Sequence, residues 1–300
     1  MKKYLAIALA ALLLVGSLAS CVQANPDAID NYTPEVDYIV TEQGTFYFEE
    51  AEGETAILVN YNGKATKDDH VVIPATFNDR TVTVIGEKAF YSLASVVEVT
   101  IPDTVVKIDK YAFARCTELT AINLPAGLLE ISDMAFAECD KLETVNLGNS
   151  LVTIGEMAFA NCTALKNIPL PATLETIDEG AFWNCTALTA IEFPASLKSI
   201  ATLAYYNCTG IAEENSIKFN SGDTAIGNYA FVTEDGNNVD KIDLTGLKED
   251  SAVLKYVHSI LDIEETETEA GTGENETVES DTAEEATEEA TEASTEEAAE

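Results

Sequence analysis

The apolar positions of this chain recur with a fixed period of 23 residues. An Ile is followed four and five residues later by Ala and an aromatic residue, and this pattern starts at Ile85, Ile108, Ile131, Ile154 and Ile177. Less regular copies start at Ile200 and Ile226. Self-similarity at a fixed period of about 20–50 residues indicates an array of stacked structural repeats.

Each unit predicts two short extended segments and one turn segment. Around Leu119, the apolar residues Ile122 and Leu124 alternate with polar ones, which predicts a strand with one buried face. Pro125 ends this strand, because proline has no N–H for a sheet ladder. A second extended segment ends at the repeat Ile, and one or two helical turns are predicted for the x-x-Ala-Phe-x-x-Cys segment after it. A single unit leaves its apolar side open, so neighbouring units are expected to stack.

The unit resembles the BspA-type (treponemal-type) leucine-rich repeat, Leu-x-x-Ile-x-Leu-Pro-x-x-Leu-x-x-Ile-x-x-x-Ala-Phe-x-x-Cys, over about residues 82–244. The resemblance implies a repeat solenoid with short parallel strands, short helical turns and about seven rungs. It also implies a bacterial surface protein, in some cases an adhesin, without a catalytic motif. The last unit departs from the pattern, since Asn220 replaces the Pro and Glu234 stands where Cys is expected. These departures are typical of a terminal, capping rung.

The segments that flank the repeats are predicted to be caps. Residues 38–83 hold short apolar runs separated by turn residues, which predicts a small antiparallel β cap and the entry to the first repeat. The solenoid is placed at residues 84–247. Apolar residues then recur at helical spacing, so a capping helix is predicted over residues 248–263, from the positions of Val253, Leu254, Val257, Ile260 and Leu261.

The N-terminus has the features of an export signal. Two lysines precede an apolar run over residues 5–15, which is too short to span a bilayer stably. Leu18-Ala19-Ser20-Cys21 looks like the lipobox of bacterial lipoproteins, which implies a signal peptide over residues 1–20 and a lipid on Cys21. Residues 21–37 are then a lipidated N-terminus and linker. Cleavage after Ala24 by an ordinary signal peptidase is the alternative. The expected location is the outer face of the cytoplasmic membrane or the outer membrane.

The formal net charge of −37 is unevenly distributed. Residues 264–300 hold 16 acidic and no basic residues, which leaves 37 acidic and 16 basic residues, a net of −21, in the first 263. The tail has almost no large apolar residues, so a disordered acidic tail is predicted. Nucleic acid is not an expected partner, because binding to phosphates needs clustered Lys and Arg.

The sequence predicts no catalytic centre, no metal and no cofactor. The five repeat cysteines, which are also 23 residues apart, would be either disulfide or metal partners or a column of buried thiols. Their odd number and a rung spacing of about 4.8 Å favour the buried thiols. His70 and His258 belong to no recognisable triad, and no phosphate-binding loop or metalloprotease motif occurs. We therefore expect a protein that is not an enzyme.

Two candidate ligand surfaces remain. One is the row of residues between the last two strand apolar positions, which should point outward: Thr100, Asn123, Asn146, Pro169, Glu192 and Lys218. The other is the pair Trp183 and Tyr206, which would form an aromatic platform on neighbouring rungs if exposed and would cover the core if not. The expected partner is a protein or glycan ligand outside the cell. A structural envelope protein that only spaces the acidic tail outward is the alternative function.

Overall fold

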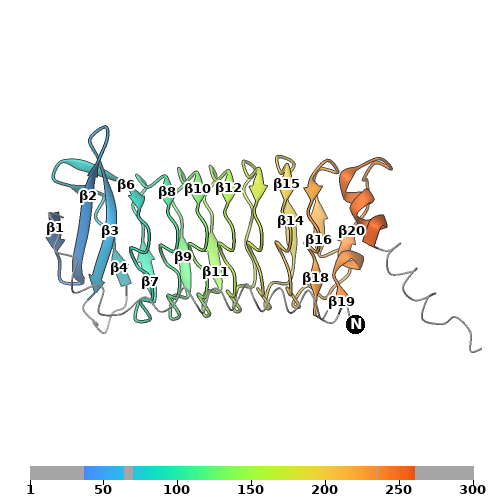
Figure 1. Cartoon of the computed structure of the whole chain (residues 1–300), viewed down its shortest axis with the longest axis horizontal. Helices are drawn as coiled ribbons and strands as arrows, with labels where there is room; N and C mark the ends of the chain where they lie inside the picture. Colours follow the sequence, from blue (N-terminus) through green and yellow to red (C-terminus); the bar gives the residue numbers. More distant parts are fainter. Residues whose placement is uncertain (1–36, 64–69, 235, 261–300) are drawn as a thin grey trace, which may run out of the picture. The chain divides into compact units, whose positions relative to one another are not determined.

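The computed structural model describes residues 37–63, 70–234 and 236–260. The predicted leucine-rich-repeat solenoid is confirmed: short strands of successive repeats pair in parallel and in register, as between Ile108 and Ile131. The stack has about eight turns, compared with the seven predicted (Figure 1). The cap supplies an additional turn, because its residues Leu58 and Val71 pair with Ile85 and Val99 of the first repeat.

One side of the stack is an 11-stranded sheet (Figure 1). β1, β2 and β3 form the predicted antiparallel cap, β3 pairs in parallel with β6, and β5 pairs antiparallel with β6. The repeat strands follow in parallel beyond β6. The strands are β1 (Asp37–Val40), β2 (Gly44–Ala51), β3 (Thr55–Gly63), β5 (Thr76–Phe77), β6 (Arg80–Ile85), β8 (Lys107–Ile108), β10 (Glu130–Ile131), β12 (Thr153–Ile154), β13 (Thr176–Ile177), β15 (Ser199–Ile200) and β17 (Ala225–Ile226).

A second side carries two shorter parallel sheets, in the orders β11-β9-β7-β4 and β14-β16-β20. Between them, the rung that contains Pro169 pairs with β11 only through an isolated bridge from Thr144 to Asn167. Proline removes a ladder donor, which accounts for the break. The strands are β4 (His70–Val72), β7 (Glu98–Thr100), β9 (Ala121–Asn123), β11 (Thr144–Asn146), β14 (Ile191–Phe193), β16 (Ile217–Phe219) and β20 (Ile242–Asp243).

The third side of each rung is made of consecutive tight turns, which corrects the expected helical turns. In the second repeat, Tyr111 and Arg115 have positive φ values of 58° and 64° and cannot belong to a right-handed helix. The backbone N–H groups alternate between two partners. That of Cys116 donates to Phe113 O three residues earlier, at 3.2 Å, whereas that of Phe113 donates to Ala135 O of the next rung, at 2.8 Å. Bonds between rungs thus take the place of the bonds that a helix would make within itself.

Stacked aromatic rings run through the core. Phe113, Phe136, Phe159 and Phe182 are fully buried, and the centroids of neighbouring rings are 5.2, 5.2 and 5.4 Å apart with interplanar angles of 2–4°. Tyr205 continues the stack at 4.8 Å from Phe182. The repeat Ile and Leu side chains are buried in the same cluster. The apolar positions that define the 23-residue period therefore form one continuous core.

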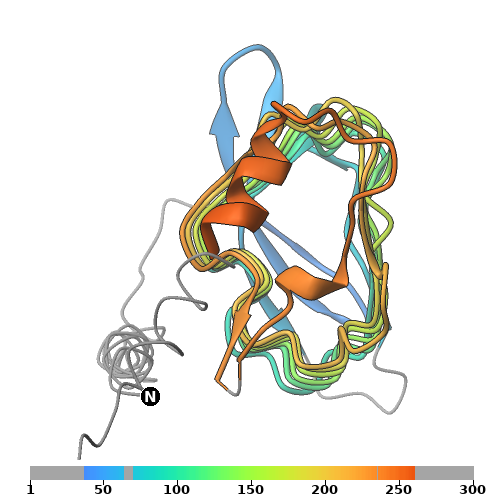
Figure 2. The same cartoon turned by 90° about the vertical axis from the view of Figure 1, so that its right-hand side faces the viewer.

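The last turn is closed by irregular elements and a helix. β18 (Val232–Thr233) and β19 (Gly236–Asn237) form an antiparallel pair, and the 3-10 helix η2 (Val239–Lys241) follows. Residues 252–260 are helical and lie across the end of the stack (Figure 2). Val253 and Val257 of this helix are buried in the main core. The end of the stack is thus shielded from solvent, as a repeat array requires.

We expect the substitution Tyr205→Phe to stabilise the protein. Tyr205 is fully buried, and its hydroxyl group has no hydrogen-bond partner among the described residues. An unpaired buried polar group costs about 1–3 kcal/mol. The free energy of unfolding from urea titration should therefore rise by about 1 kcal/mol or more. An unchanged or lower value would show that the hydroxyl group has a partner.

Candidate ligand-binding surface

The predicted outward row lies on the second side of the stack, on strands β7, β9, β11, β14 and β16 (Figure 1) and, for Pro169, on the rung between β11 and β14. Thr100 pairs with Asn123, Asn123 with Asn146, and Glu192 with Lys218. Side chains alternate along a strand, so the buried neighbours of these residues fix their outward direction. All six members, here called the polar row, are exposed: Thr100, Asn123, Asn146, Pro169, Glu192 and Lys218.

The structure adds one residue at each end of the polar row. Val72 of β4 pairs with Thr100, and Asp243 of β20 pairs with Lys218. Val72 is 45% exposed, so it brings an apolar side chain to the first end of the row. Sequence analysis missed both residues because the chain departs from the 23-residue period at each end of the array. In the sequence, only the apolar residues next to them, Val71 and Ile242, indicated that these two side chains point outward.

The polar groups at the centre of the row are largely unpaired within the protein. Asn146 accepts a hydrogen bond from Gly148 N at 3.2 Å through Oδ1. Among the described residues, its Nδ2 group and the whole amide of Asn123 have no hydrogen-bond partner. Although the two residues are in register, their amides do not bond to each other. Donors and acceptors of this kind on a rigid sheet are available to a ligand.

A second asparagine column shows the opposite arrangement. On the turn side, Asn184 Nδ2 donates to Asn161 Oδ1, and Asn207 Nδ2 donates to Asn184 Oδ1, each at 2.9 Å. These amides satisfy one another along the stack. All three residues have φ values of 57–60°, which asparagine tolerates better than most residues. That column is structural, whereas the Asn123 amide and the Asn146 Nδ2 group are not used by the fold among the described residues.

The two halves of the polar row differ in charge. Glu192, Lys218 and Asp243 occupy the last rungs. The first half, from Thr100 to Pro169, is uncharged. Two positions earlier on each rung, Ala121, Thr144 and Asn167 are also uncharged, whereas the residue on β7 is the exposed Glu98. We call the uncharged residues beyond β7 the neutral patch: Ala121, Asn123, Thr144, Asn146 and Asn167. In a body with a net charge of −21, an uncharged polar area across three rungs is a distinct chemical surface.

The predicted aromatic platform is wrong, because Trp183 and Tyr206 are only 6% and 3% exposed. Their ring centroids are 4.6 Å apart, and both rings belong to a small second core with Met157. Gly180 lies beside the pair: a Cβ atom there would be 3.3 Å from Met157 Cγ and 3.7 Å from Trp183 Cε3. The pair therefore covers the turn side of the solenoid and leaves the polar row as the candidate surface.

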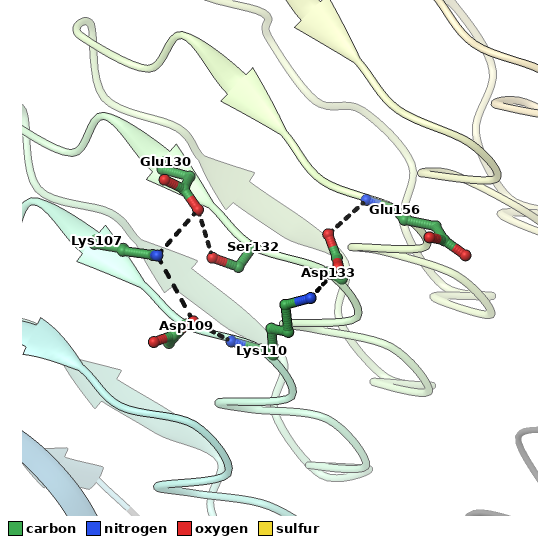
Figure 3. A network of polar contacts seen from close by, with 7 residues as sticks. All are labelled: Lys107, Asp109, Lys110, Glu130, Ser132, Asp133 and Glu156. Atoms are coloured by element: carbon green, nitrogen blue, oxygen red, sulfur yellow. Dashed lines mark hydrogen bonds and ion pairs between the residues drawn. The ribbon is translucent and has the colours of Figure 1, made fainter.

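Charged residues link neighbouring rungs on the other faces (Figure 3). Lys107 Nζ lies 3.3 Å from Glu130 Oε1, which also accepts a hydrogen bond from Ser132 at 2.7 Å. Lys110 Nζ lies 2.6 Å from Asp133 Oδ2. These side chains are one-third or more exposed, and such pairs contribute only about 0–1 kcal/mol each. The network connects rungs and does not form a catalytic arrangement.

Like charges accumulate on the rungs beyond this network. Burial, followed by the Asp133 and Glu179 carboxylates, raises the pKa of the Glu156 carboxyl above its usual value. Burial and then Asp133 raise the pKa of Asp178 as well. No group of His, Cys, Asp and Glu within the part of the chain that the structure describes is arranged to hold a metal ion. These carboxylates therefore add local repulsion rather than a defined site.

The repeat cysteines form the predicted column of buried thiols. Cys116, Cys139, Cys162, Cys185 and Cys208 are all free and buried. The Cys139 thiol donates to Phe113 O at 3.2 Å, and four equivalent bonds follow the stack. Burial raises the pKa of Cys116 and of Cys208 to about 12, so these thiols stay protonated and unreactive at neutral pH. The column is structural.

The two histidines lie apart from each other. His70 is exposed on β4, and its Nε2 lies 2.8 Å from the hydroxyl oxygen of Thr100, at the first end of the polar row. His258 is exposed on the terminal helix. Among the described residues, no carboxylate forms a hydrogen bond with either histidine, so the His70–Thr100 pair is not part of a triad. His70 instead positions the Thr100 side chain.

Several predictions concern residues that the structure does not describe. The signal peptide, Cys21 and the linker lie in residues 1–36, and the acidic tail lies in residues 261–300. Within the described residues, no helix is both long and apolar enough to cross a membrane.

Comparisons with known proteins agree with the repeat pattern. Six copies of the "BspA type Leucine rich repeat region" match residues 83–212. A solved leucine-rich-repeat protein of T. pallidum is 27% identical, with a TM-score of 0.57, and the match covers 76% of this chain and 95% of that one. A leucine-rich-repeat protein of Bacteroides ovatus is 27% identical, with a TM-score of 0.47, over 65% of this chain and 57% of that one. A search of curated proteins gave no significant match.

The family match and the geometry describe the same segment. The matched copies run from β6 to the turn segment after β15. Throughout this range the Ile, aromatic and Cys positions repeat regularly. The T. pallidum protein extends the likeness over most of the chain. Residues 83–212 therefore match the BspA-type leucine-rich repeat region and fold as a parallel solenoid.

Proposed function

We propose that this protein is an extracytoplasmic, lipid-anchored binding protein that recognises its ligand along the polar row and carries out no reaction itself. The observation that supports this most is the row itself: exposed side chains in register on β7, β9 and β11, with the Asn123 amide and the Asn146 Nδ2 group unused among the described residues. Groups held in place before binding lose little entropy when a ligand arrives. The solenoid thus presents a surface that is ready to bind.

The proposed location rests on the N-terminal sequence and on the family. BspA-type repeats are typical of bacterial surface proteins, and Cys21 stands at the lipobox position. Two acyl chains on one cysteine would hold a protein on a membrane stably, whereas a single chain gives only marginal binding. The anchor would leave the solenoid outside the cytoplasm, on the outer face of the cytoplasmic membrane or on the outer membrane.

The anchor predicts a clear effect of the substitution Cys21→Ala. In detergent phase separation of cells that make the full chain, the native protein should enter the detergent phase. The Cys21→Ala protein should move to the aqueous phase, because it has lost its acyl chains. A variant with a neighbouring change, Gln23→Ala, serves as the control and should stay with the detergent. If both variants partition like the native protein, the anchor is wrong.

Binding can be tested by capture on the immobilised full chain. Host extracellular material and envelope fractions are passed over the wild-type protein and over Asn146→Asp, which adds one charge to the centre of the polar row. Asn228→Asp is a matched control, because Asn228 is also an exposed asparagine but lies on the turn side. A saturable ligand that is lost with Asn146→Asp and kept with Asn228→Asp supports the proposal. A ligand that responds to neither variant places binding elsewhere.

A structural role in the envelope is the second candidate function. It is favoured by the unbroken Phe stack and by the ion pairs between rungs, which connect one turn to the next along the array. In that case, capture would yield no saturable ligand, and deletion of the protein would alter envelope integrity. Ligand capture and the deletion phenotype therefore separate the two functions.

A further inference from the structure

The neutral patch differs in chemistry from the rest of the molecule. Its five outward residues are three asparagines, one threonine and one alanine, all without charge. The first 263 residues have a net charge of −21, so other parts of the surface repel anionic polymers. An uncharged ligand would meet the least electrostatic penalty here.

We infer that the neutral patch binds an uncharged, extended glycan chain that lies along the stacking direction, with about one sugar unit per rung. This inference rests on the proposed function and names the ligand class for the same surface. The expected contacts run from sugar hydroxyl groups to the amides of Asn123, Asn146 and Asn167 and to the hydroxyl group of Thr144.

The first observation that favours a glycan is the hydrogen-bonding capacity of the patch. A sugar hydroxyl group both donates and accepts hydrogen bonds. An asparagine amide can pair with it in both ways, through its carbonyl oxygen and its N–H groups. Among the described residues, the Asn123 and Asn167 amides and the Thr144 hydroxyl group have no hydrogen-bond partner, and Asn146 keeps its two N–H donors. The Asn161–Asn184–Asn207 column shows that stacked amides in this protein can satisfy one another. Those of the patch do not, so they remain available.

The composition of the patch argues against a protein partner at this place. Protein interfaces depend on a few anchors, which are mostly Trp, Tyr, Arg and Met. The patch contains none of these residues, and Trp183 and Tyr206 are buried elsewhere. The groups that the patch does offer are hydrogen-bond donors and acceptors, which match the hydroxyl groups of a glycan.

The second observation is the distance between equivalent residues on neighbouring rungs of the patch. The ring centroids of successive rungs are 4.8–5.4 Å apart, and neighbouring strands of a sheet lie about 4.8 Å apart. One sugar unit of an extended β-linked chain has a similar length. A glycan along the stack would therefore place about one sugar unit over each rung. Each contact alone is weak, so affinity should grow with chain length until the three rungs are covered.

The test uses the full chain and isothermal titration calorimetry with neutral β-1,4-linked di- and hexasaccharides of glucose, N-acetylglucosamine, mannose and xylose. At least one hexasaccharide should bind, at least about tenfold more tightly than its disaccharide. In Asn123→Asp/Asn146→Asp, which adds two charges with little change in volume, affinity should fall by about tenfold or more. The control Asn228→Asp should stay within about twofold of the wild type.

The outcomes separate this inference from the proposed function. If no hexasaccharide binds at millimolar concentration, or if the double variant binds as well as the wild type, the glycan inference is overturned. If a protein ligand is then captured in an Asn146-dependent way, the polar row still acts as a binding surface. If changes in the polar row alter the binding of neither a glycan nor a protein, both proposals fail.

Discussion

Replacement of Phe136 by Ala should lower the free energy of unfolding by about 3–5 kcal/mol, the range for a buried Phe. Phe136 is fully buried, and its ring lies 5.2 Å from those of Phe113 and Phe159. Its loss would leave a cavity at the centre of the array and remove two stacking contacts. Neighbouring rungs cannot close the gap, because their spacing is fixed by backbone bonds on all three sides.

This expectation can be measured by urea unfolding followed by circular dichroism. The control is Lys141→Ala, because that side chain is more than half exposed and forms only a surface ion pair. Surface changes of this kind usually stay within about 0.5 kcal/mol. A loss below about 1 kcal/mol for Phe136→Ala would show that the Phe stack does not hold the rungs together.

Trp183→Ala should also destabilise the protein by about 3–5 kcal/mol. The indole is 6% exposed, contacts the Tyr206 ring and lies beside Gly180. Its removal would open the small second core on the turn side, which Met157 also lines. Ligand binding by the folded fraction should remain normal, because the polar row lies on a different side of each rung.

Stability and ligand capture must be measured on the same Trp183→Ala protein. The Asn146→Asp variant is the converse control, with near-normal stability and impaired capture. A Trp183→Ala protein that keeps its stability and loses its ligand would return Trp183 and Tyr206 to the binding surface. It would also contradict the burial of the indole.

The stacked columns could be predicted because the 23-residue period maps directly onto them. Residues such as Ile108 and Ile131 occupy the same position on neighbouring rungs and pair in register. The same reasoning placed Asn123 and Asn146 on one exposed row. Equal spacing along the chain is sufficient for both, because each rung repeats the path of the one before.

The turn side could not be predicted in the same way. Its residues Tyr111 and Arg115 have positive φ, and its N–H groups bond partly to the next rung. Local propensity says little about partners 22 residues away. The burial of Trp183 depends on packing against Met157 and Tyr206 of the neighbouring rungs, which only the structure reveals. The additional first turn depends on pairing between the cap and the repeats.

Photo-crosslinking from the polar row tests the proposed function most directly. A photoreactive phenylalanine analogue is placed at position 169 of the polar row, which keeps the Asn123 and Asn146 amides, in the full chain on the cell and, separately, at position 228. We predict a ligand crosslink from position 169 that free ligand competes away, and none from position 228. A competed crosslink from position 228 alone would contradict the assignment of the polar row as the binding surface.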